Sequence, residues 1–227
     1  MGTRRRFSFD EQMIVNSIFY DYKSPYYLGT SNVMMSMILG TDPVGTIAHE
    51  FYQAISVLES MNHPNKIAIE KLNQINTYDQ KIIALVDTFG VNSFLKDLNK
   101  DNYSIINGFR IDSGNPIKVA NKIISYIKDS LFFDPTEKSY IFSDSLDVDK
   151  AVFLKKIFNE YKCIFGIGTN FTCDIKDQGI NPLNIVIKLC EVNNEYVVKL
   201  SDSSGKISGD VETIQMIKKI HNWVPTE

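Results

Sequence analysis

Four consecutive segments of the chain repeat one pattern, in which an apolar, strand-like run ends in a short polar or glycine-containing cluster. The clusters, in chain order, are Asp87-Thr88, Asp112-Ser113-Gly114, Ser143-Asp144 and Gly166-Ile167-Gly168-Thr169. Helix caps alone account for any one of them. A common site at the carboxyl ends of parallel strands accounts for all four together. The pattern therefore predicts an α/β fold with a functional site at that edge.

The second cluster lies in the stretch Phe109-Arg110-Ile111-Asp112-Ser113-Gly114-Asn115-Pro116, where a predicted strand gives way to a predicted helix. Proline is accepted in the first turn of a helix, and glycine allows the backbone to turn sharply or to approach a ligand. When the octet is considered alone, the favoured interpretation is a strand, an N-cap and a turn without chemistry.

Hydrophobic periodicity and turn residues predict the remaining elements. We expect Ser31 to cap the second helix, and Asn193-Asn194 to form a hairpin turn. We also expect an α/β domain over residues 1–182 and an antiparallel hairpin with a closing helix over 183–227. The predicted helices are 9–22, 33–39, 50–61, 65–74, 91–98, 116–133, 148–161 and 209–220, and the predicted strands are 26–28, 43–48, 82–86, 103–111, 140–142, 163–165, 184–192 and 195–200.

Composition excludes several classes of function. The 227 residues include 24 lysines and arginines against 27 acidic residues, and this balance argues against general binding to nucleic acid or acidic membranes. No apolar run is long enough to span a bilayer. Three cysteines without a C-x-x-C pair favour a reduced, cytoplasmic setting, and three histidines form no visible zinc motif.

The strand-end residues allow specific chemistry. Backbone N–H groups of Gly166 to Thr169 can bind a phosphate, although tight packing explains this stretch as well. Asp112 and Asp144 can bind ribose hydroxyls or a Mg²⁺-bearing pyrophosphate, or can simply be solvated caps. Arg110 can hold a carboxylate or phosphate with two hydrogen bonds.

His49 lies between Gly45-Thr46 and a predicted helix start, where an anion is favoured. An imidazole at this position can take up a phosphoryl group, because histidine forms covalent intermediates. Without further information, a core histidine with satisfied hydrogen bonds is the simpler interpretation.

Seven short motifs, taken in order, resemble those of the nicotinate phosphoribosyltransferase family. They are Gly2-Thr3-Arg4-Arg5-Arg6, Gly29-Thr30-Ser31-Asn32, Gly45-Thr46-Ile47-Ala48-His49-Glu50, Phe109-Arg110-Ile111-Asp112-Ser113-Gly114, Phe142-Ser143-Asp144, Phe165-Gly166-Ile167-Gly168-Thr169 and Lys199-Leu200-Ser201-Asp202-Ser203. The resemblance covers essentially the whole chain.

The resemblance implies an enzyme that joins nicotinate to phosphoribosyl pyrophosphate and couples the reaction to ATP hydrolysis, with Mg²⁺ as cofactor. The products are nicotinate mononucleotide and pyrophosphate, in the salvage route to NAD. It also implies an irregular, partial (β/α) barrel of the type II phosphoribosyltransferase kind, with a small antiparallel C-terminal appendage.

The same resemblance assigns roles to individual residues. It implies that His49 is transiently phosphorylated by ATP, and that Asp112 and Asp144 hold the ribose during catalysis. Ser31, which can donate to a carboxylate, is expected to favour nicotinate over nicotinamide. The implied nicotinate-binding residues are Ser31, Thr46 and Arg110, and the implied phosphoribosyl pyrophosphate-binding residues are Arg4, Ser113, Gly114, Ser143, Gly166, Gly168 and Thr169.

Members of the family are much longer, and their N-terminal half, with an aromatic residue that stacks on the pyridine ring, has no counterpart here. We therefore expect a homodimer or association with a missing N-terminal half, and no turnover by this chain alone. A non-catalytic fragment or subunit is one alternative. A nicotinamide or quinolinate phosphoribosyltransferase is the other; Ser31 argues against the first of these enzymes and His49 against the second.

Replacing Ser31 with aspartate tests its expected role in selecting acid over amide. In the complete enzyme, Ser31→Asp should lower nicotinate use more than tenfold, about 1.4 kcal/mol, because the new carboxylate repels that of the substrate. The measurement is the ratio of nicotinate to nicotinamide turnover, and an unchanged ratio would remove Ser31 from the account of specificity.

Overall fold

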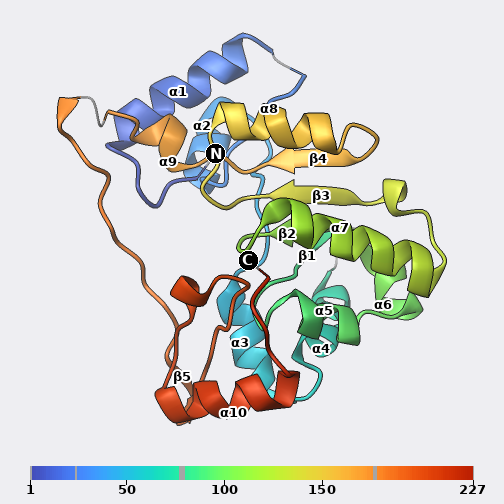
Figure 1. The fold of residues 1–227 in the computed structure, drawn as a ribbon. Coiled ribbons are helices and arrows are strands. Elements are labelled where there is room, and N and C mark those ends of the chain that lie inside the picture. Colours follow the sequence, from blue (N-terminus) through green and yellow to red (C-terminus); the bar gives the residue numbers. More distant parts are fainter. Residues whose placement is uncertain (1, 24, 77–79, 176–177, 227) are drawn as a thin grey trace. The chain divides into compact units, whose positions relative to one another are not determined.

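The computed structural model describes residues 2–23, 25–76, 80–175 and 178–226 (Figure 1). The chain divides into two compact units. Unit 1 comprises residues 1–45, 145–153 and 165–187, and unit 2 comprises residues 46–144, 154–164 and 188–227.

A four-stranded sheet in the order β1-β2-β3-β4 is formed by β1 (Ile82–Leu85), β2 (Ile106–Ile111), β3 (Ser139–Phe142) and β4 (Lys162–Phe165). The pairs β1–β2 and β2–β3 are parallel, and their register places Leu85 opposite Arg110 and Ile111 opposite Phe142. The first three polar clusters of the sequence therefore follow neighbouring strands at one edge of the sheet. This confirms the predicted α/β class with a mostly parallel sheet.

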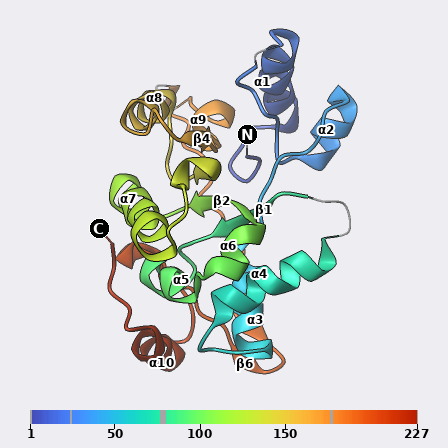
Figure 2. The same ribbon diagram turned by 90° about the vertical axis from the view of Figure 1, so that its right-hand side faces the viewer.

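Helices accompany this sheet in unit 2, and two of them begin at clear capping signals. Pro116 occupies the first turn of α7, and the Asn115 side chain accepts from the N–H groups of Ile117 and Lys118. Asp210 caps α10 in the same way. Helix α3 packs against α4 (Figure 2). The last residues of α8 (Val148–Ile157) also belong to this unit. The other helices of the unit are α3 (His49–Leu58), α4 (Pro64–Ile75), α5 (Val91–Asp97), α6 (Lys100–Ile105), α7 (Pro116–Tyr126) with the π-helical turn Ile127–Leu131, and α10 (Val211–His221).

The C-terminal segment contributes to the same core as β1 and α3. Val198, Leu200 and Ile217 are buried with Tyr52 and Leu85 in one hydrophobic cluster. The Leu200 N–H donates to the carbonyl of Thr88 at 2.8 Å, so this segment is bound directly to the end of β1.

The predicted C-terminal hairpin forms, but it is much shorter than expected. Strands β5 (Glu191–Val192) and β6 (Glu195–Tyr196) pair antiparallel around Asn193-Asn194, which both adopt positive φ. The predicted strands 184–192 and 195–200 are wrong outside these residues. Most apolar side chains before β5 do not enter a core, and Ile187 is 90% exposed, so a run of β-favouring residues alone does not make a strand.

Three other predicted strands also require correction. Residues 26–28 and 43–48 form no strand. The predicted strand 103–111 begins only at Ile106, because Asn99 and Asn102 form a reciprocal capping box that starts α6 at Lys100.

Unit 1 contains helices α1 (Phe9–Asp21), α2 (Val33–Leu39) and α9 (Thr169–Thr172), and the first residues of α8. Ser8 caps α1 by accepting from the Glu11 N–H at 3.0 Å. The cap of α2 is Asn32, which accepts from the Met35 N–H at 3.0 Å, so the prediction of Ser31 as the cap was one residue early.

Removing one hydroxyl from the core tests the contact between α3 and β1. The fully buried Tyr52 Oη accepts from the Leu85 N–H at 3.1 Å. Tyr52→Phe should lower the free energy of unfolding by about 1–3 kcal/mol, because the buried N–H loses its acceptor. Urea titration measures the change, with Tyr22→Phe, at a position 81% exposed, as the neutral control. Equal stability of the two variants would contradict the assignment.

Candidate active site

Polar side chains from five parts of unit 2 meet at the carboxyl ends of the strands. They come from the start of α3, the ends of β1, β2 and β3, and the C-terminal segment. The residues are Thr46, His49, Asp87, Thr88, Arg110, Asp112, Ser113, Ser143, Asp144, Lys199, Asp202 and Lys206.

His49 is the first residue of α3, whose N-cap Ala48 offers no side-chain acceptor. Its Nδ1 lies 3.0 Å from Thr88 Oγ1, and its Nε2 lies 2.9 Å from Lys199 Nζ and 3.2 Å from Asp112 Oδ2. The imidazole is thus held on both sides at a helix N-terminus, where the backbone dipole favours an anion.

All three guanidinium nitrogens of Arg110 contact side chains of the site. It donates from Nε to Ser143 Oγ at 2.9 Å and from Nη1 to Thr46 Oγ1 at 2.8 Å, and its Nη2 pairs with Asp112 Oδ1 at 3.0 Å. The structure therefore brings together Thr46 and Arg110, the two residues of unit 2 expected to bind nicotinate.

Asp112 lies at the centre of the cluster. Burial of its carboxyl group would raise its pKa, but the hydrogen bond with His49, the charge of Arg110 and the hydrogen bond from Ser143 hold that pKa well below its usual range. The Ser143 hydroxyl donates to Oδ1 at 2.6 Å. Asp112 is therefore a carboxylate near neutral pH.

Two lysines of the C-terminal segment complete the charge balance, and sequence reasoning assigned neither a role. Burial lowers the pKa of Lys199, against the opposing effect of the Asp87 and Asp112 charges. Lys206 pairs with Asp144 Oδ1 at 2.5 Å and donates to the Asp112 carbonyl at 3.1 Å. The motif that contains Lys199 was visible in the sequence, but its contact with His49 spans 150 residues and no local pattern reports it.

A buried network lies beneath these contacts. Ser113 Oγ donates to Asp87 Oδ2 and accepts from the Asp202 N–H at 3.0 Å, and Asp202 Oδ2 accepts from the Val91 N–H at 2.9 Å. Gly114 has φ of +73°, and a Cβ there would meet the Asp202 Cβ at 2.8 Å. The glycine lets the C-terminal segment approach the end of β2 closely.

Unit 1 brings together the other predicted residues. Thr3 Oγ1 accepts from Asn32 Nδ2 at 3.3 Å, and a Cβ on Gly2 would lie 3.7 Å from the Cα of Gly168. The motifs containing Arg4, Ser31, and Gly166, Gly168 and Thr169 thus lie in one compact unit. Arg4 and Ser31 are exposed, and Thr169 is the first residue of the one-turn helix α9.

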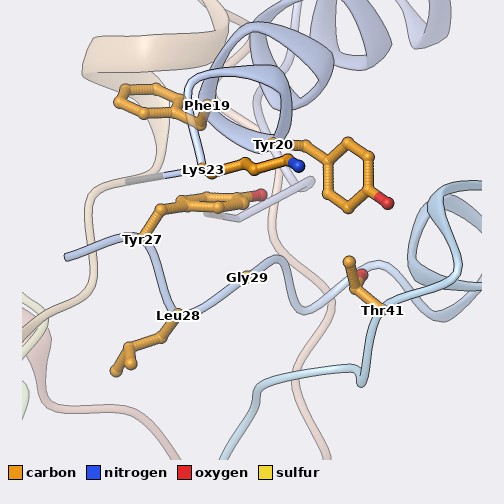
Figure 3. A pocket seen from close by; sticks show the side chains of 7 residues that line it. All are labelled: Phe19, Tyr20, Lys23, Tyr27, Leu28, Gly29 and Thr41. Carbon is orange, nitrogen blue, oxygen red and sulfur yellow. The ribbon is translucent and has the colours of Figure 1, made fainter. Parts of the chain in front are cut away.

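An open cavity of about 250 Å³ also lies in unit 1 (Figure 3). Phe19 and Tyr27 stack beside it with ring centroids 5.2 Å apart. It is lined by Phe19, Tyr20, Lys23, Tyr27, Leu28, Gly29 and Thr41, and none of these is a predicted site residue.

Within the described ranges, no group of three or more His, Cys, Asp or Glu side chains is arranged to hold a metal ion. No helix in the same residues has the length and apolar character needed to cross a membrane.

Comparison with known proteins gives a consistent result. Residues 1–223 match the model of the nicotinate phosphoribosyltransferase (NAPRTase) family. The chain belongs to this family. It is 40% identical to the nicotinate phosphoribosyltransferase of Yersinia pestis over 222 residues, and 44% identical to that of Buchnera aphidicola subsp. Schizaphis graminum over 207 residues.

Solved members of the family share the fold. The nicotinate phosphoribosyltransferase of Vibrio cholerae matches 99% of this chain with a TM-score of 0.92 at 35% identity, and that of Porphyromonas gingivalis matches 98% with a TM-score of 0.90 at 32% identity. The matches cover 54% of the Yersinia pestis protein, 51% of the Buchnera protein and 55% and 58% of the two solved chains. The chain thus spans about half the length of these relatives.

The buried Asp202 should make the stability of the protein depend on pH. Burial and the Asp87 charge raise the pKa of Asp202 from 3.8 to about 7. The folded state therefore retains a proton that the unfolded state loses, so the associated stability is complete below about pH 4 and is lost as the pH rises to about 7.

Asp202→Asn removes this titration. We compare the free energies of unfolding of the wild type and the variant at each pH. The wild-type value minus the variant value should fall by on the order of a few kcal/mol between pH 4 and 7, and should then stay constant. Urea unfolding across this range measures it, with Asp101→Asn at an exposed position as control. A difference that stays constant with pH would contradict the raised pKa.

Proposed function

We propose that the protein containing this chain is a nicotinate phosphoribosyltransferase, which joins nicotinate to phosphoribosyl pyrophosphate and hydrolyses ATP in the process. Family membership over residues 1–223 supports the class of reaction. The observation that carries the proposal is His49 at the N-terminus of α3, with the carboxylates of Asp87 and Asp112 and the ammonium of Lys199 around its Nε2.

In this proposal His49 accepts the γ-phosphoryl group of ATP. A ring nitrogen forms a bond to phosphorus while the bond from phosphorus to the bridging oxygen breaks, and ADP leaves with that electron pair. The ammonium groups of Lys199 and Lys206, both within 4 Å of site carboxylates, can exchange those partners for phosphate oxygens.

Asp87 and Asp112 would hold the Mg²⁺ that accompanies the phosphates. Asp87 Oδ1 is buried without a hydrogen-bond partner among the described residues, and lies 3.9 Å from His49 Nε2. One or two carboxylates beside the phosphates are the usual protein ligands of this ion, which neutralises charge on the phosphate oxygens.

Nicotinate binding is proposed for Thr46 and Arg110 in unit 2 and for Ser31 in unit 1. The hydroxyl of Thr46 already contacts the guanidinium of Arg110, and a substrate carboxylate can replace that contact with two hydrogen bonds from the arginine.

We assign phosphoribosyl pyrophosphate to the remaining predicted residues. Asp112 and Asp144 would hold the ribose, and a carboxylate near the anomeric carbon stabilises the positive charge that develops as pyrophosphate leaves. The phosphate groups would contact Arg4, Ser113, Gly114, Ser143, Gly166, Gly168 and Thr169.

The finer predictions about architecture are also part of this proposal. The parallel pairing of β1, β2 and β3 supports a partial, irregular (β/α) barrel. We also propose a domain boundary at residue 182, and either a homodimer or an association with a further N-terminal half. A cytoplasmic location is the final part of the proposal, and the free thiols of Cys163, Cys173 and Cys190 support it.

Labelled ATP tests the role of His49. The intact protein that contains this chain should form an acid-labile phosphoprotein, and His49→Gln should abolish it. His63→Gln is a matched control, because His63 pairs with Asp97 in the same unit without contacting the site. Label retained in His49→Gln would refute the assignment, and absence of nicotinate mononucleotide with all substrates and Mg²⁺ would refute the function.

A further inference from the structure

The buried face of α1 is polar, where a surface helix normally carries apolar side chains. The structure describes this helix throughout, and its buried side chains are Gln12 and Asn16, one turn apart and both fully buried. A buried amide costs free energy unless its hydrogen bonds are made. The partners of these two amides therefore indicate what the polar face does.

Gln12 holds both ends of one turn. The turn runs from Thr3 to Arg6 and is closed by a bond from the Arg6 N–H to the Thr3 carbonyl at 3.2 Å. At its start, Gln12 Nε2 donates to the Gly2 carbonyl at 3.2 Å and to Thr3 Oγ1 at 3.4 Å. At its end, Gln12 Oε1 accepts from Arg6 Nη1 at 3.2 Å. Because a carbonyl only accepts and a guanidinium only donates, a single orientation of the amide satisfies both ends.

The turn is also bound to the two neighbouring loops of unit 1. The Phe7 N–H donates to the Thr172 carbonyl at 2.7 Å, which ties the end of the turn to α9, directly after the Gly166–Thr169 loop. Thr3 Oγ1 accepts a second bond from Asn32 Nδ2 at 3.3 Å, and Asn32 is the cap of α2. The turn thus has a defined place beside both loops.

Arg4 is the residue that this arrangement presents. It follows Thr3 directly, between the two ends that Gln12 holds, and it is exposed. A flexible loop would lose conformational freedom on binding a phosphate, and a loop fixed in advance avoids that cost. An arginine on a fixed turn therefore binds an anion more tightly than the same arginine on a mobile one.

We propose that Gln12 is a positioning residue that fixes the turn Thr3–Arg6 and thereby the position of Arg4. Its consequence for binding rests on the proposed function, in which Arg4 contacts phosphoribosyl pyrophosphate. Gln12 is fully buried, so it acts on the substrate only through the turn.

Hydrogen exchange of the intact protein, measured by mass spectrometry without substrate, tests the effect on the turn. Gln12→Met keeps the length of the side chain but removes the amide. The backbone amides of residues 2–7 should then exchange at least about tenfold faster, because the bonds at both ends of the turn are lost and it opens locally. Exchange as slow as in the wild type would overturn the proposal.

Asn16→Leu is the matched control, because it removes the other fully buried amide of α1. The Asn16 amide donates to the main-chain carbonyl of Gln12 at 2.7 Å and accepts from the Tyr27 hydroxyl, without contacting the turn. This variant should lose stability but leave exchange in residues 2–7 unchanged. Equal acceleration in both variants would show a general loosening of α1 and would overturn the proposal.

A pair of substitutions at Thr3 decides the matter if Gln12→Met does not fold. Thr3→Val removes the hydroxyl to which Gln12 donates, and Thr3→Ser retains it. Exchange in residues 2–7 should accelerate in the valine variant and not in the serine variant. The acceleration should be smaller than in Gln12→Met, because the bond to the Gly2 carbonyl remains. No difference between the two Thr3 variants would then overturn the proposal.

A double-mutant cycle tests whether Gln12 acts through Arg4. Calorimetry gives the Kd of phosphoribosyl pyrophosphate with Mg²⁺ for the intact protein. Gln12→Met should raise this Kd about 10- to 100-fold in the wild-type background, as misplacement of a binding group does. In the Arg4→Ala background the same change should have little further effect. Equal effects in the two backgrounds would overturn the link to Arg4.

The outcomes distinguish this inference from the proposed function. If the wild type makes no nicotinate mononucleotide, or does not bind phosphoribosyl pyrophosphate, the proposed function fails. Hydrogen exchange without substrate still decides whether Gln12 fixes the turn. If the wild type is active and Gln12→Met changes neither the exchange nor the Kd, the inference fails and the proposed function stands.

Discussion

The carboxylate of Asp112 is the interaction centre on which the arrangement of the site depends. It joins β2 to α3 through His49, to β3 through Ser143, and to the guanidinium of Arg110 on its own strand. A buried carboxylate is tolerated only when several partners offset the loss of water. Because those partners come from separate elements, satisfying this one charge also fixes where the elements stand around it.

The sequence predicted the parts of the site that local chemistry determines. Strand ends carry their own signals, so the sequence predicts Asp112, Ser143 and Asp144 at the carboxyl ends of neighbouring strands, and the parallel register confirms this. Lys199 was different. Its partner His49 is 150 residues away, and nothing about a lysine in an apolar run indicates which distant group it meets.

Errors in the predicted elements have the same origin. The apolar, β-branched run before β5 favours a strand, yet most of its side chains are exposed and it forms none, because a strand also needs a neighbour with which to pair. At α6 a short-range signal prevailed instead: the reciprocal bonds of Asn99 and Asn102 define a helix start inside a stretch of β-favouring residues. The hydrophobic pattern and the residue propensities define which secondary structures a segment can adopt. The contacts with neighbouring segments determine which of these structures forms.

The bond between Leu200 and Thr88 has a consequence for how the protein is made. During synthesis, α3, β1 and β2 leave the ribosome long before Lys199. In that interval the carboxylates of Asp87 and Asp112 cannot interact with the ammonium group of Lys199. Contacts between residues far apart in sequence also form slowly, because a long loop must close first. The site therefore reaches its final charge balance late in folding, when the C-terminal segment reaches the end of β1.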